Sequence, residues 1–76
     1  MRKKTEVIDT GIGNRIKEHR MKLGMSQRDL AKCLEVSDTA ISAIERGSNY
    51  PSIETLKKIS DMFNISIDYL LKGEDR

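Results

Sequence analysis

The stretch VSDTAISAIERG, residues 36–47, places its large apolar residues where one face of an α-helix needs them. Val36 and Ser37 predict the start of this helix, because the serine hydroxyl can cap free backbone N–H groups and the valine can pack back onto Ile41. Gly47 predicts its end. The opposite, outward face would hold Asp38, Thr39, Ser42, Ala43 and Arg46. Exposed helix faces usually carry longer charged side chains, so this face needs an explanation.

Four further helices are predicted around this one. Gly24 is a stop signal for the first, and Ser26 with Asp29 forms a capping box that starts the second. Pro51 opens the fourth and Ser66 caps the fifth. Their expected ranges are 12–23, 27–34, 52–64 and 66–71. No long stretch alternates polar and apolar residues as a strand would, so the fold class is predicted to be all-α, a compact bundle of five short helices.

The apolar positions of these helices define the expected core. It comprises Ile16, Leu23, Met25, Leu30, Ala31, Leu34, Val36, Ala40, Ile41, Ile44, Ile53, Leu56, Ile59, Phe63 and Leu70. So short a chain forms one domain. We expect this domain over residues 11–72, between a basic N-terminal arm at 1–10 and a C-terminal tail at 73–76.

The composition of the 76-residue chain narrows its class. Its single cysteine, Cys33, rules out an internal disulfide and a cysteine-cluster metal site, which fits a reducing cytosol. The uncharged stretches are too short for a membrane span or an export signal. His19 has no partners at ligand spacing, and no acid, base and nucleophile stand in a catalytic pattern. We therefore expect a cytoplasmic protein that is not an enzyme and holds no metal or cofactor.

The net charge of +2 is unevenly distributed along the chain. Residues 1–37 carry nine basic and five acidic side chains, a net of +4, whereas residues 38–76 carry five and seven, a net of −2. The first half could attract a polyanion that the second half avoids. Ordinary solvated charge explains this distribution equally well.

The helices at 27–34 and 38–46 are joined by only three residues, Glu35, Val36 and Ser37. So short a connection predicts a steep crossing, the geometry of a helix-turn-helix whose second helix is free to enter the major groove of DNA. Short side chains would bring that helix close to the base edges, where Ser and Thr can hydrogen-bond and methyl groups can touch thymine. A plain surface helix remains the alternative, since periodicity indicates only which side is exposed.

A set of segments occurs at a combined spacing that is specific for one family. They are Arg15-Ile16-Lys17, Arg20, Gly24-Met25-Ser26-Gln27, Leu30-Ala31, Leu34, Val36-Ser37, Ile41-Ser42, Ile44-Glu45-Arg46-Gly47, Pro51-Ser52 and Ser66-Ile67-Asp68-Tyr69-Leu70-Leu71. On these segments, residues 15–71 resemble the phage-repressor and Cro type of helix-turn-helix domain, also known from xenobiotic-response-element regulators. The resemblance implies a lambda-repressor-like fold and a DNA-binding regulator of transcription.

The resemblance also implies roles for single residues. It assigns contact with bases or phosphates to Ser26, Gln27, Ser37, Asp38, Thr39, Ser42, Ala43, Arg46, Ser48, Asn49 and Tyr50. It pairs Arg20 with Glu45 in a salt bridge that ties the first helix to the third. For Asp38, strengthening of the helix N-terminus is favoured over acceptance from a cytosine amino group. Glu35 departs from the family, which usually has glycine there, so we expect either strain of about 1 kcal/mol or a different turn.

The predicted function is repression of transcription by a homodimer that binds a partly palindromic operator in a bacterium or phage. The apolar candidates for the dimer contact are Ile67, Tyr69, Leu70 and Leu71. An antitoxin or anti-repressor that uses the same fold mainly to bind a protein is the alternative. A steep loss of binding with rising salt would favour DNA as the partner.

Overall fold

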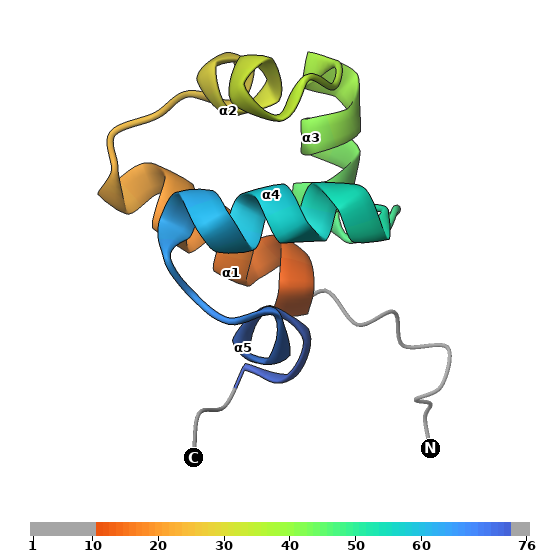
Figure 1. Ribbon diagram of the computed structural model, residues 1–76. Coiled ribbons are helices and arrows are strands. Elements are labelled where there is room, and N and C mark those ends of the chain that lie inside the picture. Colours follow the sequence, from red (N-terminus) through yellow and green to blue (C-terminus); the bar gives the residue numbers. More distant parts are fainter. Residues whose placement is uncertain (1–10, 74–76) are drawn as a thin grey trace.

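The computed structural model describes residues 11–73 and contains five helices in that range (Figure 1). They are α1 (Gly11–Lys22), α2 (Gln27–Leu34), α3 (Asp38–Arg46), α4 (Ile53–Phe63) and α5 (Ile67–Lys72). The all-α prediction is confirmed, and each boundary lies within one residue of the expected one. The arm predicted at 1–10 and residues 74–76 of the tail lie outside the described residues. Within the described range, no helix combines the length and apolar character that a membrane crossing requires.

Serine side chains cap four of the helices, at the three serines that the sequence predicts and at Ser52, where Pro51 was expected to open the helix. The Oγ atoms of Ser26, Ser37, Ser52 and Ser66 each accept a hydrogen bond from the backbone N–H three residues later. At Ser26 the bond is reciprocal, because Asp29 Oδ2 accepts from the Ser26 N–H at 2.9 Å. This backbone bond, followed by the bond from the serine side chain, lowers the pKa of Asp29 below its usual 3.8. The carboxylate therefore stabilises the fold above that pH, and its contribution is lost as the pH falls through the lowered pKa.

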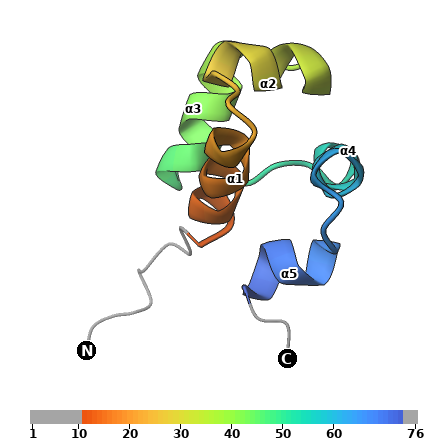
Figure 2. The ribbon, with the colours of Figure 1, turned by 90° about the vertical axis from the view of Figure 1, so that its left-hand side faces the viewer.

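The core lies where α1 meets α3 and α5, and α4 closes it against α2 and α5 (Figures 1 and 2). Its buried apolar residues are Ile12, Ile16, Leu30, Ala31, Leu34, Ile41, Ile44, Leu56, Ile59, Phe63 and Leu70. Met25 and Val36 are half-buried and pack against this cluster. The predicted core was wrong at Leu23 and Ile53, which are 57% and 72% exposed, and at Ala40, which is half-buried and lies outside the core cluster. Leu23 follows the last residue of α1 and Ile53 is the first residue of α4, so neither lies on the inner face of a full helical turn.

Gly13 is the point of closest approach between α1 and α3. A Cβ atom added there would overlap the backbone carbonyl oxygen of Ile44 and would lie 2.8 Å from that of Glu45. Both obstacles are backbone atoms, which cannot rotate away as a side chain can. Only glycine therefore allows α1 to pack this closely on α3.

The turn between α2 and α3 contains a strained residue. Glu35 ends α2 with φ 63° and ψ 43°, the left-handed conformation that favours glycine. The sequence left open whether Glu35 would be strained or the turn would differ. The turn keeps the geometry that glycine would give, so Glu35 is strained. Lys58 Nζ lies 3.4 Å from Glu35 Oε1 and 3.4 Å from the Leu34 carbonyl oxygen, so α4 holds the turn in place.

Replacing Glu35 with glycine should raise the free energy of unfolding by about 0.5–1 kcal/mol, because relief of the left-handed strain exceeds the loss of an exposed ion pair. Urea denaturation measures the change. Glu35→Ala is the control, because it removes the same ion pair while keeping the strain, and it should be slightly less stable than the wild type. A Glu35→Gly variant that unfolds at a lower urea concentration than Glu35→Ala would contradict the strain.

Candidate nucleic-acid interface

The connection between α2 and α3 leaves one side of α3 uncovered. Only residues 35–37 join the two helices, and Val36 packs against the core and anchors the turn. Figure 2 shows α2 and α3 together at one end of the molecule, with α5 at the other end. In the same view α1 lies on the inner side of α3, and the outer side of α3 faces solvent. This is the helix-turn-helix geometry that the short connection predicts.

The solvent-facing side of α3 is narrower than predicted. Asp38, Thr39 and Arg46 are exposed and Ser42 is half-buried, and we call these four residues the outer stripe. The outward placement of Ala43 was wrong, because it is only 9% exposed. After α3 the chain turns back, and both the backbone N–H and the hydroxyl of Ser48 donate to the Ala43 carbonyl, at 3.0 and 3.2 Å. The buried arc of α3 therefore extends from Glu45 round to Ala43.

Arg46 lies along the outer stripe. Its Nη1 donates to Ser42 Oγ at 3.2 Å and its Nη2 to Ser48 Oγ at 3.3 Å. A guanidinium carries five N–H donors, so three remain for other acceptors. The two serines thus hold a cation in a fixed position near the C-terminal end of α3.

A buried polar network connects the inner face of α3 to α1 and α2. Arg20 donates to both carboxylate oxygens of Glu45, from Nε at 2.7 Å and from Nη2 at 3.1 Å. The expected ion pair is therefore present, and its side chains are 10% and 4% exposed. Arg20 Nη1 also donates to the Met25 carbonyl at 2.7 Å. With this third bond the buried charges are well satisfied, as a desolvated pair requires.

Gln27 joins this network, which the sequence does not indicate. Its Nε2 donates to Glu45 Oε1 at 3.0 Å. One amide hydrogen is therefore engaged, and the second is available to another acceptor. Gln27 and Glu45 are 18 residues apart, so no local spacing signals their contact.

Arg28 is a second residue that sequence reasoning missed. Its Nε lies 3.4 Å from Asp38 Oδ2, and the two side chains are 73% and 53% exposed. The pair bridges the second residue of α2 and the first residue of α3. It places a cation beside the N-terminal end of the outer stripe.

The remaining residues expected at the interface lie around the outer stripe. The Ser26 and Ser37 oxygens accept from backbone N–H groups in their capping roles. The Ser26 hydroxyl also bonds to the Asp29 carboxylate, whereas the Ser37 hydroxyl hydrogen is free to donate. Ser48, Asn49 and Tyr50 follow α3 and are exposed. These positions flank the stripe at both ends.

The residues expected at a dimer contact differ in their exposure. Leu70 is fully buried, so its assignment to that contact was wrong and it belongs to the core. Tyr69 is half-buried, and its ring meets the edge of His19, which stacks on Phe63. Ile67 is also half-buried and Leu71 is exposed. Three of the four candidates therefore keep accessible surface on α5.

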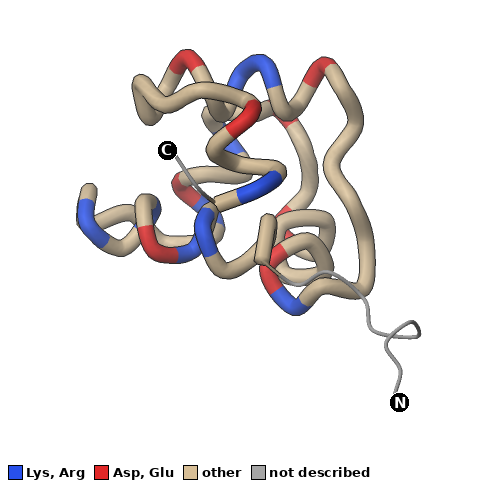
Figure 3. The backbone as a smooth tube through the Cα atoms, turned by 90° about the horizontal axis from the view of Figure 1, so that it is seen from below, with Lys and Arg blue, Asp and Glu red and all other residues tan. Residues whose placement is uncertain are grey.

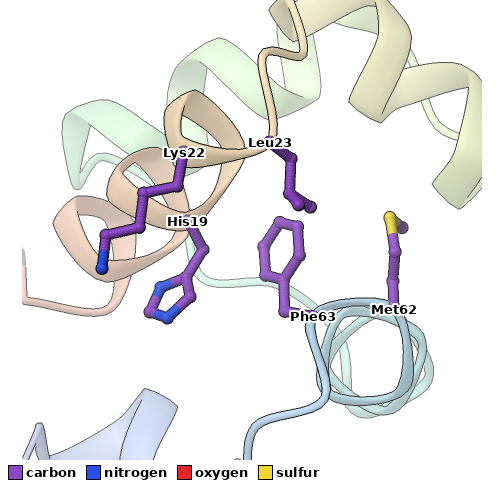
Figure 4. A pocket seen from close by; sticks show the side chains of 5 residues that line it. All are labelled: His19, Lys22, Leu23, Met62 and Phe63. Atoms are coloured by element: carbon purple, nitrogen blue, oxygen red, sulfur yellow. The ribbon is translucent and has the colours of Figure 1, made fainter.

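A small apolar pocket lies between the C-terminal ends of α1 and α4, away from the outer stripe. It has a volume of about 160 Å³ and is lined by His19, Lys22, Leu23, Met62 and Phe63. In Figure 4 the Lys22 ammonium group points away from the Phe63 ring, so no charge is directed into the pocket. His19 is half-buried. No three metal-ligating side chains come together among residues 11–73.

Charge is mixed over the described part of the chain. Figure 3 shows basic and acidic positions interspersed along the helices. Although residues 38–76 are net acidic in sequence, α4 and α5 each carry equal numbers of basic and acidic residues. The placement of single arginines beside the outer stripe is therefore more informative than the charge of either half.

Comparisons with known proteins agree with this geometry. A family model described as Helix-turn-helix matches residues 16–70. The HTH-type transcriptional regulator ImmR of Bacillus subtilis (strain 168) is 41% identical over 64 residues, 84% of this chain and 50% of ImmR. The HTH-type transcriptional activator BcrR of Enterococcus faecalis is 44% identical over 64 residues, 84% of this chain and 31% of BcrR. The chain thus spans half or less of these relatives.

The similar solved structures include DNA complexes. The P22 c2 repressor bound to synthetic operator 9T superposes with a TM-score of 0.79 and 43% identity. The superposition covers 83% of this chain and 96% of that chain. The two chains therefore share a fold along nearly the whole of the repressor domain.

Proposed function

The chain belongs to the helix-turn-helix family, and on this premise we propose that it binds double-stranded DNA sequence-specifically and regulates transcription. The outer stripe of α3 is the observation that carries the proposal. Its middle is formed by Thr39 and Ser42, which are short and can hydrogen-bond to base edges. Long side chains there would hold the helix away from the groove floor.

The dimensions of the outer stripe suit the major groove. With its side chains an α-helix is about 10–12 Å across, and less on a face of short side chains. The major groove of B-DNA is about 12 Å wide. The Arg46 guanidinium lies at the C-terminal end of the stripe, where a phosphate ridge would run.

The donors that flank the stripe fit phosphate oxygens. Gln27 keeps one amide hydrogen, and Ser37 keeps its hydroxyl hydrogen. Asn49 and Tyr50 supply exposed donors past the C-terminal end of α3, whereas both donors of Ser48 are engaged by the Ala43 carbonyl. Such contacts fix the register of a protein on the duplex without reading sequence.

The buried ion pair between Arg20 and Glu45 fits a positioning role. It joins α1 to the inner face of α3 and, through Gln27, to the start of α2. A change in α1 packing would therefore be passed to the helix that reads the bases. A buried pair contributes little net stability, so orientation is the better reason for its presence.

The regulator we propose acts as a homodimer in the cytoplasm of a bacterium. Ile67, Tyr69 and Leu71 keep accessible surface on α5 for the dimer contact. Two copies would place their α3 helices in successive major grooves about 34 Å apart, on a partly palindromic site. Repression is the sign we propose, by similarity to the P22 c2 repressor, although BcrR is named an activator.

Selection of bound duplexes from a random pool tests the proposal. The chain should enrich one sequence with two related half-sites whose centres lie about ten base pairs apart, because the two helices face the same side of the duplex. Affinity for the enriched duplex should fall roughly 10³-fold or more between 50 and 200 mM salt if six or more phosphates are contacted. Fluorescence anisotropy at several salt concentrations measures this slope.

A chain that enriches no sequence and shows no salt-dependent binding would contradict DNA binding. It would favour the alternative, in which the same fold serves mainly as a protein-binding module. A contact made through the apolar residues of α5 would depend weakly on salt.

A further inference from the structure

The carboxylate of Asp38 has no evident place on a surface that meets phosphates. It is exposed at the first residue of α3, at the end of the outer stripe. The capping hydrogen bond comes from Ser37, whose Oγ accepts from the Ala40 N–H at 3.0 Å. Asp38 is therefore not needed as the hydrogen-bonding cap, and the expected stabilisation of the helix N-terminus by its charge does not use its hydrogen-bonding capacity. The DNA phosphates repel a carboxylate placed near them, so Asp38 would weaken binding unless its charge is neutralised or it accepts a hydrogen bond.

Arg28 supplies the neutralisation. Its Nε lies 3.4 Å from Asp38 Oδ2, and both side chains remain largely exposed. An exposed pair of this kind contributes little to folding, so its geometry is better explained by what it presents to solvent. It presents a carboxylate acceptor directly beside a guanidinium donor.

That order of groups matches one base pair. In the major groove a C·G pair shows the donor N4–H₂ of cytosine next to two adjacent acceptors, O6 and N7 of guanine. A carboxylate can accept from N4–H₂ while a guanidinium donates to O6 and N7. In an A·T pair the adenine donor lies between the two acceptors, so a guanidinium fork cannot reach both of them without displacing the carboxylate.

We infer that Arg28 and Asp38 act together as a specificity-determining pair that reads one C·G base pair in each half-site. Asp38 accepts from the cytosine, and Arg28 donates to the guanine and offsets the charge of Asp38. This inference rests on the proposed function and adds a base identity to it. Arg28 lies on α2, so reading the site requires both helices of the motif.

Duplex selection with single variants tests the pair. The wild-type chain should enrich C·G at one position per half-site. Arg28→Ala should reduce the preference for C·G over A·T at that position by about 5- to 150-fold, the range for one bidentate contact. Asp38→Asn should change the preference to adenine, because an amide can pair with N6 and N7.

Lys57→Ala is the matched control. Lys57 is exposed on α4, so the variant removes one positive charge, as Arg28→Ala does, without touching the motif. It should weaken binding to all duplexes slightly and leave every base preference unchanged. Circular dichroism melting curves should show that all three variants fold, since the altered side chains are exposed.

The outcomes distinguish a failure of the base-reading pair from a failure of the proposed DNA binding. If Arg28→Ala and Asp38→Asn change affinity equally for all duplexes, Arg28 is a phosphate contact and the base-reading pair is wrong, while DNA binding stands. The base-reading pair would also be wrong if the wild-type chain enriched A·T at the base pair whose preference these two variants change. If the wild-type chain enriches no sequence at all, the proposed function fails and the inference fails with it.

Discussion

Replacing Gly13 with alanine is expected to destabilise the domain by about 2–3 kcal/mol, a large share of the stability of a domain this small. The new Cβ atom would overlap the Ile44 carbonyl oxygen and approach that of Glu45. Alanine is the better helix former by about 1 kcal/mol, so the net loss understates the clash itself. Urea denaturation gives the change in unfolding free energy, provided that the dependence on urea is unchanged.

The matched control for Gly13→Ala is Asn14→Ala on the same helix. Asn14 is exposed, so this variant gains helix propensity without any clash and should be as stable as the wild type or slightly more stable. A Gly13→Ala chain within 0.5 kcal/mol of the wild type would show that α1 can move away from α3 freely. In that case α1 does not fix the position of the helix that we propose reads DNA.

The helix boundaries were predictable because their signals are local. Ser37 bonds to a backbone N–H only three residues away, and Gly47 ends α3 in the left-handed conformation by itself. The same holds for the capping box at Ser26. Such interactions depend on neighbours in the sequence, so no knowledge of the tertiary structure is needed to expect them.

The width of the buried face was not predictable from periodicity. Periodicity places Ile41 and Ile44 inside, but the burial of Ala43 depends on how the chain returns at Ser48 after α3 has ended. Leu70 shows the same limit, since an apolar residue on a terminal helix fits a core and an interface equally well. Which residues at the edge of a helix face are buried depends on the tertiary contacts of that face, which periodicity does not give.

The tertiary contacts of the candidate site required the structure or a relative. The pair between Arg20 and Glu45 is 25 residues apart in the sequence, so no local pattern predicts it. It was expected only from the family resemblance. Gln27 on Glu45 and Arg28 beside Asp38 gave no signal at all, although all four residues are visible in the sequence. Gly13 was also missed, since a glycine within a helix signals a close approach only when the second helix is known.

Replacing Ser42 with glutamate is expected to lower affinity for the selected duplex by at least 100-fold while leaving the fold intact. Ser42 lies in the middle of the outer stripe and is half-buried. A longer, negatively charged side chain there would hold α3 away from the base edges and oppose the phosphates on both ridges. It would also take the Arg46 guanidinium, which now bonds to Ser42 Oγ, into an ion pair.

Two controls separate the causes of the Ser42→Glu effect, measured by fluorescence anisotropy at fixed salt. Ser42→Ala keeps the stripe slim and should retain binding within about tenfold, since it loses hydrogen bonds worth about 1 kcal/mol. Lys57→Gln changes the net charge by the same amount at an exposed position of α4, away from the proposed dimer contact, and should lower affinity only slightly. If Ser42→Glu binds within threefold of the wild type, the outer stripe of α3 does not enter the groove. The duplex must then contact another face, because a side chain as long as glutamate in the middle of the stripe would hold α3 away from the base edges.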